Sequence, residues 1–228
     1  MKKYQHLLFD LDDTLLDFGA AEDMALHRLF EEQGIPLTED VEVKYRQINA
    51  GLWTRFEHGE ITRDEVITTR FAKLFEAFGQ EVDGEQFDEK YRNYLAESKV
   101  FVPGAWELVN QLAHKFDLYL VTNGVSTTQY KRLQITGLAP LFKNVFVSED
   151  TGYQKPMKGY FDYVFDRIPN FNTEAALIIG DSFSADIVGG IHAGIDTCWF
   201  NQQGKQGVEN YEPTYEITEL QQLKKIVL

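Results

Sequence analysis

The sequence has little cysteine, no long apolar run and no excess of bases. Cys198 is the single cysteine among 228 residues, so no disulfide can form within the chain and a reducing compartment is expected. No stretch is long and apolar enough to span a bilayer. The start, Met1-Lys2-Lys3, carries the charge of a signal peptide, but Asp10, Asp12 and Asp13 interrupt the apolar run that would have to follow. We therefore expect a cytoplasmic protein.

Basic residues are too few for a polyanionic partner. The chain has 22 Lys and Arg against 36 Asp and Glu, which gives a formal net charge of −14. Nucleic acid polymers and anionic membranes would repel such a protein, whereas a small anionic substrate can still bind at a locally positive site. The hydrophobic content of 43% is ordinary for a globular protein. The length suits one large domain, or a core domain with a smaller insert, and we expect a monomer or a weak homodimer.

The hydrophobic pattern changes twice along the chain. His6–Phe9 is a short apolar run typical of a buried strand, whereas residues from about 20 to 97 show helical periodicity only. After Pro103-Gly104, strands and helices alternate, which predicts a parallel sheet covered on both faces. The expected strands are 6–9, 118–121, 145–147, 176–179, 197–200 and 215–217, and the expected helices are 105–115, 129–138, 160–168, 185–193 and a last one to the C-terminus.

These patterns predict an α/β protein with a Rossmann-like, doubly wound parallel sheet as its core and an inserted α-helical cap. The core would comprise residues 1–17 and 98–228, and the cap residues 18–97. Within the cap, Met24, Leu26, Leu29 and Phe30 are expected on one buried face, and Phe71, Leu74, Phe75 and Phe78 on another. Ligands of open parallel sheets bind beyond the carboxyl ends of the strands, so an insert that follows the first strand is expected to cover the site.

An acidic cluster follows the first predicted strand. Asp10, Asp12 and Asp13 fall within four positions, where their charges repel one another unless a cation binds. Oxygen ligands without histidine or cysteine favour a hard ion such as Mg²⁺. The alternative is a turn of solvated acids that caps a helix, and this cluster alone does not decide between the two.

Three further polar segments lie near later strand ends. Gly180-Asp181-Ser182 and Asp186 add carboxylates, although the serines also suit a helix cap. Thr122-Asn123-Gly124 offers a hydroxyl, an amide and a flexible backbone for phosphate oxygens, or simply forms a strand-to-helix turn. Lys155 is a lone base in a loop, and such a lysine is usually solvated.

Together these segments resemble the four motifs of the haloacid dehalogenase superfamily. The match runs in order through Asp10-x-Asp12-x-Thr14, Thr122, Lys155 and Gly180-Asp181-Ser182-x-x-x-Asp186, and the helical insert falls where that superfamily places one type of cap. The wording around these motifs, such as Val121-Thr-Asn-Gly-Val125, is similar to the branch that hydrolyses pyrimidine nucleoside 5'-monophosphates.

The resemblance implies the roles of the site residues. Asp10 is expected to attack phosphorus and form an aspartyl-phosphate, while Asp12 protonates the leaving oxygen and then activates water. Thr122, Asn123 and Lys155 are expected to bind the phosphoryl group. Mg²⁺ would be held by Asp10, by Asp12 through its backbone carbonyl, and by Asp181; Asp186 would hold a metal-bound water.

Asp12 also separates branches of that superfamily. The halide-releasing members need neither a general acid at that position nor a metal, so this aspartate favours phosphoryl transfer. Alternatives that stay open are a phosphatase for another small metabolite, such as a sugar phosphate or phosphoglycolate, and a non-catalytic binding protein on the same fold.

Aromatic residues of the insert are candidates for stacking on a nucleobase. They are Phe18, Trp53, Phe56, Phe71 and Tyr91. For any one of them, a place in the core of the helical bundle is the more common outcome. Trp53 is the preferred candidate for base stacking because polar residues flank it.

Overall fold

The computed structural model describes residues 3–228, so Met1 and Lys2 of the charged start lie outside the described residues. The chain separates into two compact units, one formed by 1–18 and 99–228 and the other by 19–98. Among the described residues, no helix is long and apolar enough to cross a membrane.

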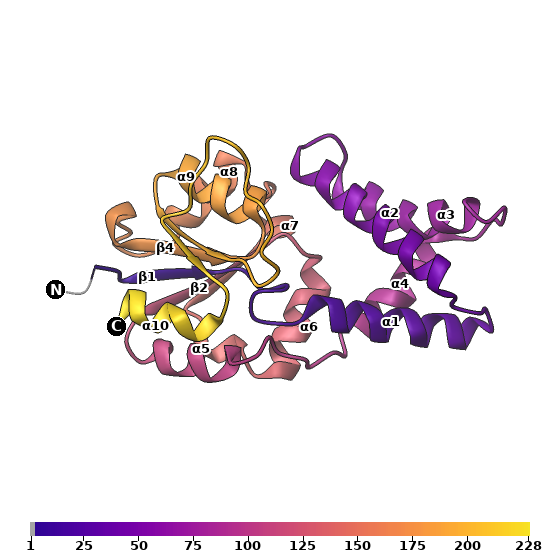
Figure 1. Ribbon diagram of the computed structural model, residues 1–228, viewed down its shortest axis with the longest axis horizontal. Helices are drawn as coiled ribbons and strands as arrows, with labels where there is room; N and C mark the ends of the chain where they lie inside the picture. The colour runs from indigo at the N-terminus through magenta and orange to yellow at the C-terminus, as the bar shows by residue number, and fades with distance from the viewer. Residues whose placement is uncertain (1–2) are drawn as a thin grey trace. The chain divides into compact units, whose positions relative to one another are not determined.

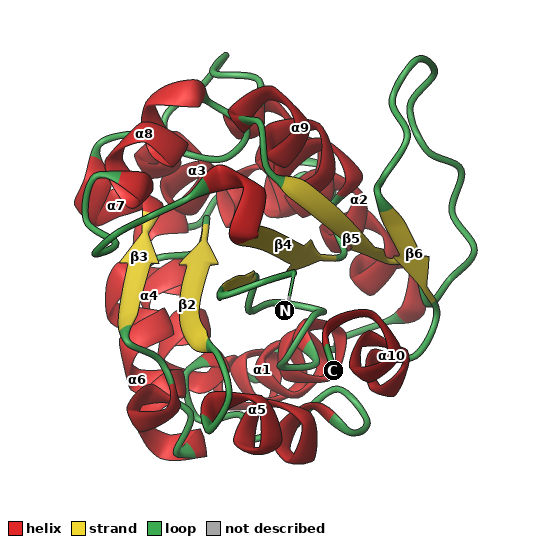
Figure 2. Ribbon diagram, turned by 90° about the vertical axis from the view of Figure 1, so that its left-hand side faces the viewer, coloured by secondary structure: helices red, strands yellow, loops and turns green. Residues whose placement is uncertain are grey.

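The first unit contains a six-stranded parallel sheet with the order β3-β2-β1-β4-β5-β6 (Figure 2). Its strands are β1 (His6–Phe9), β2 (Asp117–Thr122), β3 (Asn144–Val147), β4 (Ala176–Gly180), β5 (Asp196–Phe200) and β6 (Tyr215–Ile217). Phe9 pairs with Leu120 of β2 and with Ile179 of β4. The residues that follow these three positions therefore emerge at the same edge of the sheet. The predicted α/β core is confirmed.

Both faces of the sheet are buried, because successive residues of each strand point to opposite sides. The cluster that contains Leu7 and Phe9 of β1 includes residues of α5 (Ala105–Ala113) and α10 (Leu223–Val227), and the cluster that contains Leu8 includes residues of α8 (Lys158–Phe165). In Figure 1, α5 and α10 lie on one side of the sheet and α8 lies on the other. The helices of this unit are α5 (Ala105–Ala113), α6 (Ser126–Thr136), α7 (Ser148–Thr151), α8 (Lys158–Phe165), α9 (Gly189–Ala193) and α10 (Leu223–Val227).

Three helices of the first unit begin earlier than their patterns predict. The helix expected over 160–168 is α8, which starts at Lys158 and ends at Phe165. The helix expected over 129–138 is α6, which starts at Ser126 and ends before Gly137, a glycine in the left-handed conformation. The helix expected over 185–193 starts with a π-helical turn, Phe183–Val188, and continues as α9. Ser182 caps that turn by accepting a hydrogen bond from the Ala185 amide, so the capping alternative is correct for this serine.

The second unit is helical throughout. Its helices are α1 (Phe18–Gln33), which begins in the last residue of the first unit, α2 (Glu39–Glu57), α3 (Arg63–Glu76) and α4 (Gly84–Leu95). Thr62 and Glu65 form a capping box at the start of α3, and Thr38 and Asp83 cap α2 and α4.

The core of this unit differs from its predicted faces at two positions. Leu26, Leu29 and Phe30 are buried as expected, but the side chains of Met24 and Phe78 are exposed. Phe78 lies beyond the end of α3, so it does not continue the face formed by Phe71 and Phe75.

Charged groups also lie inside the helical unit. The Arg70 guanidinium bonds the Asp88 carboxylate at 2.5 Å and the Asn49 amide oxygen at 3.2 Å, and all three side chains are buried. These contacts join α2, α3 and α4.

Candidate active site

Lys155 is the centre of the polar cluster at the strand ends. Its side chain is buried, and its Nζ donates to Asp10 Oδ1 at 2.8 Å, to Asp186 Oδ1 at 2.6 Å and to the Val121 carbonyl at 2.9 Å. The ammonium group has three hydrogens, so these contacts use all of them. Lys155, expected as an isolated base in a loop, is thus a fixed positive charge that links the end of β1, the end of β2 and the turn after β4.

The charges of this cluster shift one another's pKa values. Burial raises the pKa of Asp10 well above its usual value, the charge of Lys155 opposes this, and the charges of Asp186 and Asp181 raise it further. Burial by itself would lower the pKa of Lys155, but the charges of Asp10 and Asp186 raise it overall. Lys155 therefore stays protonated beside the carboxylate that is expected to attack phosphorus.

Asp181 supplies a second carboxylate with a perturbed pKa. Burial, followed by the charges of Asp186 and Asp13, raises the pKa of Asp181 to about 7. One carboxylate oxygen each from Asp10, Asp181 and Asp186 lies within 4.8 Å of the others. Lys155 bonds Asp10 and Asp186, and the half-exposed Lys205 lies 3.9 Å from Asp181 Oδ2. These two lysines leave an excess of negative charge, which a hard divalent cation would offset.

Asp181 borders a small cavity, and Asp186 is held by other groups of the chain. A cavity of about 20 Å³ is lined by Asp13 and Asp181 together with Phe200, Asn201, Gln202, Gln203 and Lys205. Asp186 is less available as a ligand, because Lys155 holds one of its oxygens and the Ser182 amide donates to the other at 3.1 Å. The expected role of Asp186 in holding a metal-bound water stays a prediction.

Two small residues keep the turns after β1 and β4 in place. The hydroxyl of Thr14 accepts a hydrogen bond from the Asp181 amide at 3.1 Å. Gly180 leaves room for Asp186, since a Cβ at position 180 would lie 2.1 Å from Asp186 Oδ2. The Gly180-Asp181 sequence thus reflects close packing between the end of β4 and the following turn.

Asp12 points to a different set of partners from Asp10. Its Oδ1 accepts from Nη1 of Arg132, and its Oδ2 accepts from Nε2 of Gln129 at 2.7 Å. Both partners lie on α6 and are buried. The Asp12 carboxylate is therefore bonded to α6 and does not join the cluster of Asp10, Asp181 and Asp186. Its predicted contact with a metal through the backbone carbonyl stays a prediction.

Thr122 and Asn123 lie at the end of β2, as expected for a phosphate site, but the side chain of Asn123 is already engaged. Its Nδ2 donates to the Lys155 carbonyl and its Oδ1 accepts from the Lys155 amide, both at 2.9 Å. Asn123 thus fixes the main chain that carries Lys155. Its predicted contact with phosphate stays a prediction.

Most of the aromatic residues considered for base stacking are buried in the helical unit. Phe56, Phe71 and Tyr91 are buried, which matches the alternative reading. Trp53 is partly buried, with its ring edge-on to Phe56 at a centroid distance of 5.6 Å. Its expected stacking on a base stays a prediction.

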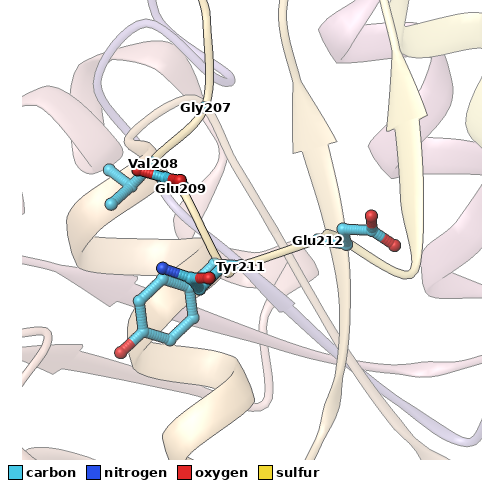
Figure 3. Close-up of a pocket in the computed structure, with 6 residues that line it drawn as sticks. Gly207, Val208, Glu209, Tyr211 and Glu212 are labelled. Carbon is cyan, nitrogen blue, oxygen red and sulfur yellow. The ribbon is translucent and has the colours of Figure 1, made fainter.

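A larger hollow is lined by residues that lie outside the predicted motifs. Its volume is about 530 Å³, and the segment between β5 and β6 lines it with Gly207, Val208, Glu209, Asn210, Tyr211 and Glu212 (Figure 3). None of the predicted site residues lines this hollow.

Comparisons with known proteins agree with the geometry. Residues 4–194 match the haloacid dehalogenase-like hydrolase family. The chain belongs to this family. The predicted family and the predicted hydrolase class are confirmed.

Three relatives of this family cover nearly the whole chain. The HAD-hydrolase YfnB of Bacillus subtilis is 57% identical over 100% of this chain and 97% of its own, and its crystal structure, described as bound to magnesium and revealing interdomain movement, has a TM-score of 0.95 with 99% of each chain covered. The pyrimidine 5'-nucleotidase PynA of Streptococcus pneumoniae is 42% identical, over 96% of this chain and 93% of its own. The pyrimidine 5'-nucleotidase YjjG of Escherichia coli is 32% identical, over 99% and 98%.

Within this haloacid dehalogenase-like hydrolase, sequence reasoning missed Gln129 and Arg132. They lie 117 and 120 positions from Asp12, in no recognised motif. A signal for them does exist: Gln129 and Arg132 share the buried face of α6 with Thr128 and Leu133. Arg132 thus falls at a helix position where the side chain is buried. A charged residue at such a position needs a partner of opposite charge, because an unpaired buried charge is costly.

Proposed function

We propose that this protein is a magnesium-dependent phosphomonoester hydrolase that acts through an aspartyl-phosphate on Asp10. The observation that carries the proposal is the arrangement of two aspartates with separate partners. Asp10 lies against the Lys155 ammonium and near Asp181, whereas Asp12 is held by α6. One strand end thus presents a nucleophile and a distinct group for proton transfer, as a two-step phosphatase requires.

Pyrimidine nucleoside 5'-monophosphates are the proposed substrates. Two relatives named as pyrimidine 5'-nucleotidases align over nearly the whole of this chain at 42% and 32% identity. The resemblance of the segments around the motifs supports the same class.

Mg²⁺ is the proposed cofactor, held by the side chains of Asp10 and Asp181 and by the backbone carbonyl of Asp12. The closeness of the Asp10 and Asp181 carboxylates and the raised pKa values of these two residues support a cation there, as does the magnesium-bound structure of the relative YfnB. When bound, the ion would neutralise charge between the anionic nucleophile and the anionic phosphate.

The residues of the chain account for both steps. A carboxylate oxygen of Asp10 attacks phosphorus as the bond from phosphorus to the ester oxygen breaks, and Asp12 gives its proton to that departing oxygen. Water then attacks phosphorus, Asp12 takes the proton of the water, and the bond between Asp10 and phosphorus breaks to release phosphate. Lys155 stabilises the charge of the transferring group, and the Thr122 hydroxyl donates to one of its oxygens.

The helical unit is proposed to act as a cap that selects the leaving group. Its place in the chain, after the strand that carries Asp10, supports this role, and so does the interdomain movement described for YfnB. Trp53 is the residue of this unit proposed to stack on the base.

A panel of phosphate esters tests the proposed function. With Mg²⁺ present, kcat/KM is expected to be highest for uridine, thymidine and cytidine 5'-monophosphates, and hydrolysis is expected to stop in Asp10→Asn. Asp17→Asn, a change of an aspartate outside the motifs, serves as the matched control and should keep turnover. Preference for a sugar phosphate or phosphoglycolate would overturn the nucleotidase assignment, and no hydrolysis of any ester would overturn the phosphatase assignment.

A further inference from the structure

Side-chain contacts connect α6 with two groups of the proposed reaction, the Asp12 carboxylate and the Thr122 hydroxyl. Arg132 Nη1 donates to Gln129 Oε1 at 3.1 Å, and it also bonds Asp12 Oδ1. Gln129 Nε2 donates to Asp12 Oδ2 at 2.7 Å and to Thr122 Oγ1 at 2.9 Å. One amide therefore links the expected proton-transfer group to the expected phosphate-binding hydroxyl.

Arg132 determines which way that amide faces. A guanidinium group only donates hydrogen bonds, so the atom of Gln129 that faces it must be the oxygen. The NH₂ group of Gln129 must then face the other way, where its two hydrogens meet the two acceptors, Asp12 Oδ2 and Thr122 Oγ1. With the amide reversed, its NH₂ group would face the Arg132 guanidinium, and neither of these two groups could accept a hydrogen bond.

The same chain determines where the Thr122 proton points. Thr122 Oγ1 accepts from Gln129 Nε2 at 2.9 Å and from the Gly124 amide at 3.3 Å. A hydroxyl oxygen has two lone pairs, so these bonds use its accepting capacity. The hydroxyl can then contribute only as a donor, and phosphate oxygens are acceptors.

The local sequence makes room for this arrangement. A Cβ at position 124 would lie 2.3 Å from Gln129 Nε2 and 2.6 Å from its Cδ, so a glycine there is needed for Gln129 to reach its partners. Arg132 is among the largest fully buried side chains of the described residues, and its pairing with Asp12 provides the opposite charge that burial requires.

We propose that Gln129 and Arg132 are positioning residues that hold the Asp12 carboxylate for proton transfer and direct the Thr122 hydroxyl proton toward the phosphoryl group. The proposal rests on the proposed function. Arg132 acts on Gln129 and Asp12, and Gln129 acts on Asp12 and Thr122; neither residue touches the substrate.

Leaving-group dependence separates positioning from a structural role. Uridine 5'-monophosphate has a poor leaving group that needs a proton, whereas p-nitrophenolate leaves without one. In Gln129→Leu, the rate of phosphoryl transfer is expected to fall about 100-fold for the nucleotide, in line with the usual contribution of general acid catalysis, and less than about 10-fold for p-nitrophenyl phosphate. Because hydrolysis of the intermediate also uses Asp12, p-nitrophenolate should appear in a burst of one equivalent per site.

Binding of inorganic phosphate tests the hydroxyl without turnover. Calorimetry with Mg²⁺ present is expected to show weaker phosphate binding, by about fivefold, in Gln129→Leu, equivalent to about 1 kcal/mol for one hydrogen bond. Gln134→Leu changes an exposed glutamine of the same helix and is the matched control for both measurements.

Arg132 is tested by two changes and one control. Arg132→Lys keeps a donor toward Gln129 and should restore most of the leaving-group selectivity that Arg132→Met loses, while Lys131→Met alters an exposed neighbour. If Arg132→Met does not fold, Arg132→Lys and Gln129→Leu still carry the test.

The outcomes distinguish the two proposals. A wild-type protein that hydrolyses no ester overturns the proposed function. If the wild type is active, equal losses on both esters in Gln129→Leu, or no loss, overturn the positioning of Asp12. Unchanged phosphate binding in Gln129→Leu overturns the directed Thr122 proton.

Discussion

At the residue scale, a single lysine connects three parts of the chain that are far apart in sequence. Lys155 Nζ bonds Asp10 and Asp186, which lie 145 and 31 positions away, together with the carbonyl of Val121. Its removal would leave two buried carboxylates without a counter-charge, which is among the costly changes a folded protein can undergo.

Lys155→Met is therefore expected to lower the free energy of unfolding of the metal-free protein by about 3–5 kcal/mol. Lys158→Met is the matched control, because Lys158 is an exposed lysine paired with Asp162 on α8, and about 1 kcal/mol or less is expected there. Urea unfolding of both variants measures the difference. Equal stability of the two variants would show that Lys155 is not the counter-charge of the site.

His6 gives a pH dependence of stability at the same scale. Burial lowers the pKa of His6 below its ordinary value of 6.5, although the charge of Asp117 opposes the shift. The folded state therefore binds its proton less readily than the unfolded state. The stability contributed by neutral His6 is complete above pH 6.5 and is lost as the pH falls toward the lower pKa of the folded protein.

The expected result is a loss of wild-type stability relative to His6→Leu between pH 7.5 and pH 5.5, as measured by urea unfolding at each pH, with the range chosen around the ordinary histidine pKa of about 6.5. His27→Gln, a change of an exposed histidine on α1, should leave the wild-type pH dependence unchanged. A constant difference between wild type and His6→Leu across this range would contradict the shifted pKa.

At the scale of secondary-structure elements, the strands were predictable and some helix starts were not. Buried parallel strands appear as short apolar runs, so the run at 176–179 predicted β4 to within one residue. The start of α6 depends on a distant group instead. The Ser126 amide bonds the Glu149 carboxylate at 2.7 Å, and no side chain at the N-cap position supplies a bond. Local sequence does not show such a tertiary cap.

The site residues likewise divide into those that the sequence predicted and those that it did not. Asp10, Lys155 and Asp181 belong to motifs and were found from resemblance, whereas Gln129 and Arg132 were missed. Gln129 and Arg132 reach Asp12 because α6 packs beside the segment that follows β1, more than a hundred positions earlier in the chain. The spacing of residues along the sequence does not reveal that contact.

A pair of glycine substitutions tests the packing between the end of β4 and its turn. Gly180→Ala would place a Cβ 2.1 Å from Asp186 Oδ2 and is expected to destabilise the protein by about 1–3 kcal/mol. Gly51→Ala, at an open position within α2, is expected to stabilise it by about 0.5–1 kcal/mol, because alanine is the better helix former. Thermal unfolding of both variants gives the sign. A Gly180→Ala variant as stable as the wild type would contradict the tight contact.

At the scale of the whole molecule, chemistry and substrate choice are assigned to different units. The first unit contains every motif residue, and the second unit supplies the candidate base-binding aromatic. The net charge of the chain is −14, and the site around Lys155 is itself rich in carboxylates, so binding of an anionic phosphate there would depend on the lysine together with a cation.

Trp53→Ala tests this division of roles. It is expected to reduce kcat/KM for pyrimidine monophosphates by an amount equivalent to about 1–3 kcal/mol, the usual value of one stacked base, and to leave p-nitrophenyl phosphate nearly unaffected. Trp106→Ala, on α5 of the first unit, is the tryptophan control. Equal losses on both esters in Trp53→Ala would mean that Trp53 serves packing alone.

The central claim is that Asp10 carries the phosphoryl group during turnover. Acid quenching of the wild-type protein during hydrolysis of a nucleoside monophosphate, followed by mass spectrometry of its peptides, tests this directly. The predicted result is a phosphoryl group on Asp10 that is absent from Asp10→Asn. Turnover with no covalent adduct in the early milliseconds, or with the adduct on another residue, would contradict the claim.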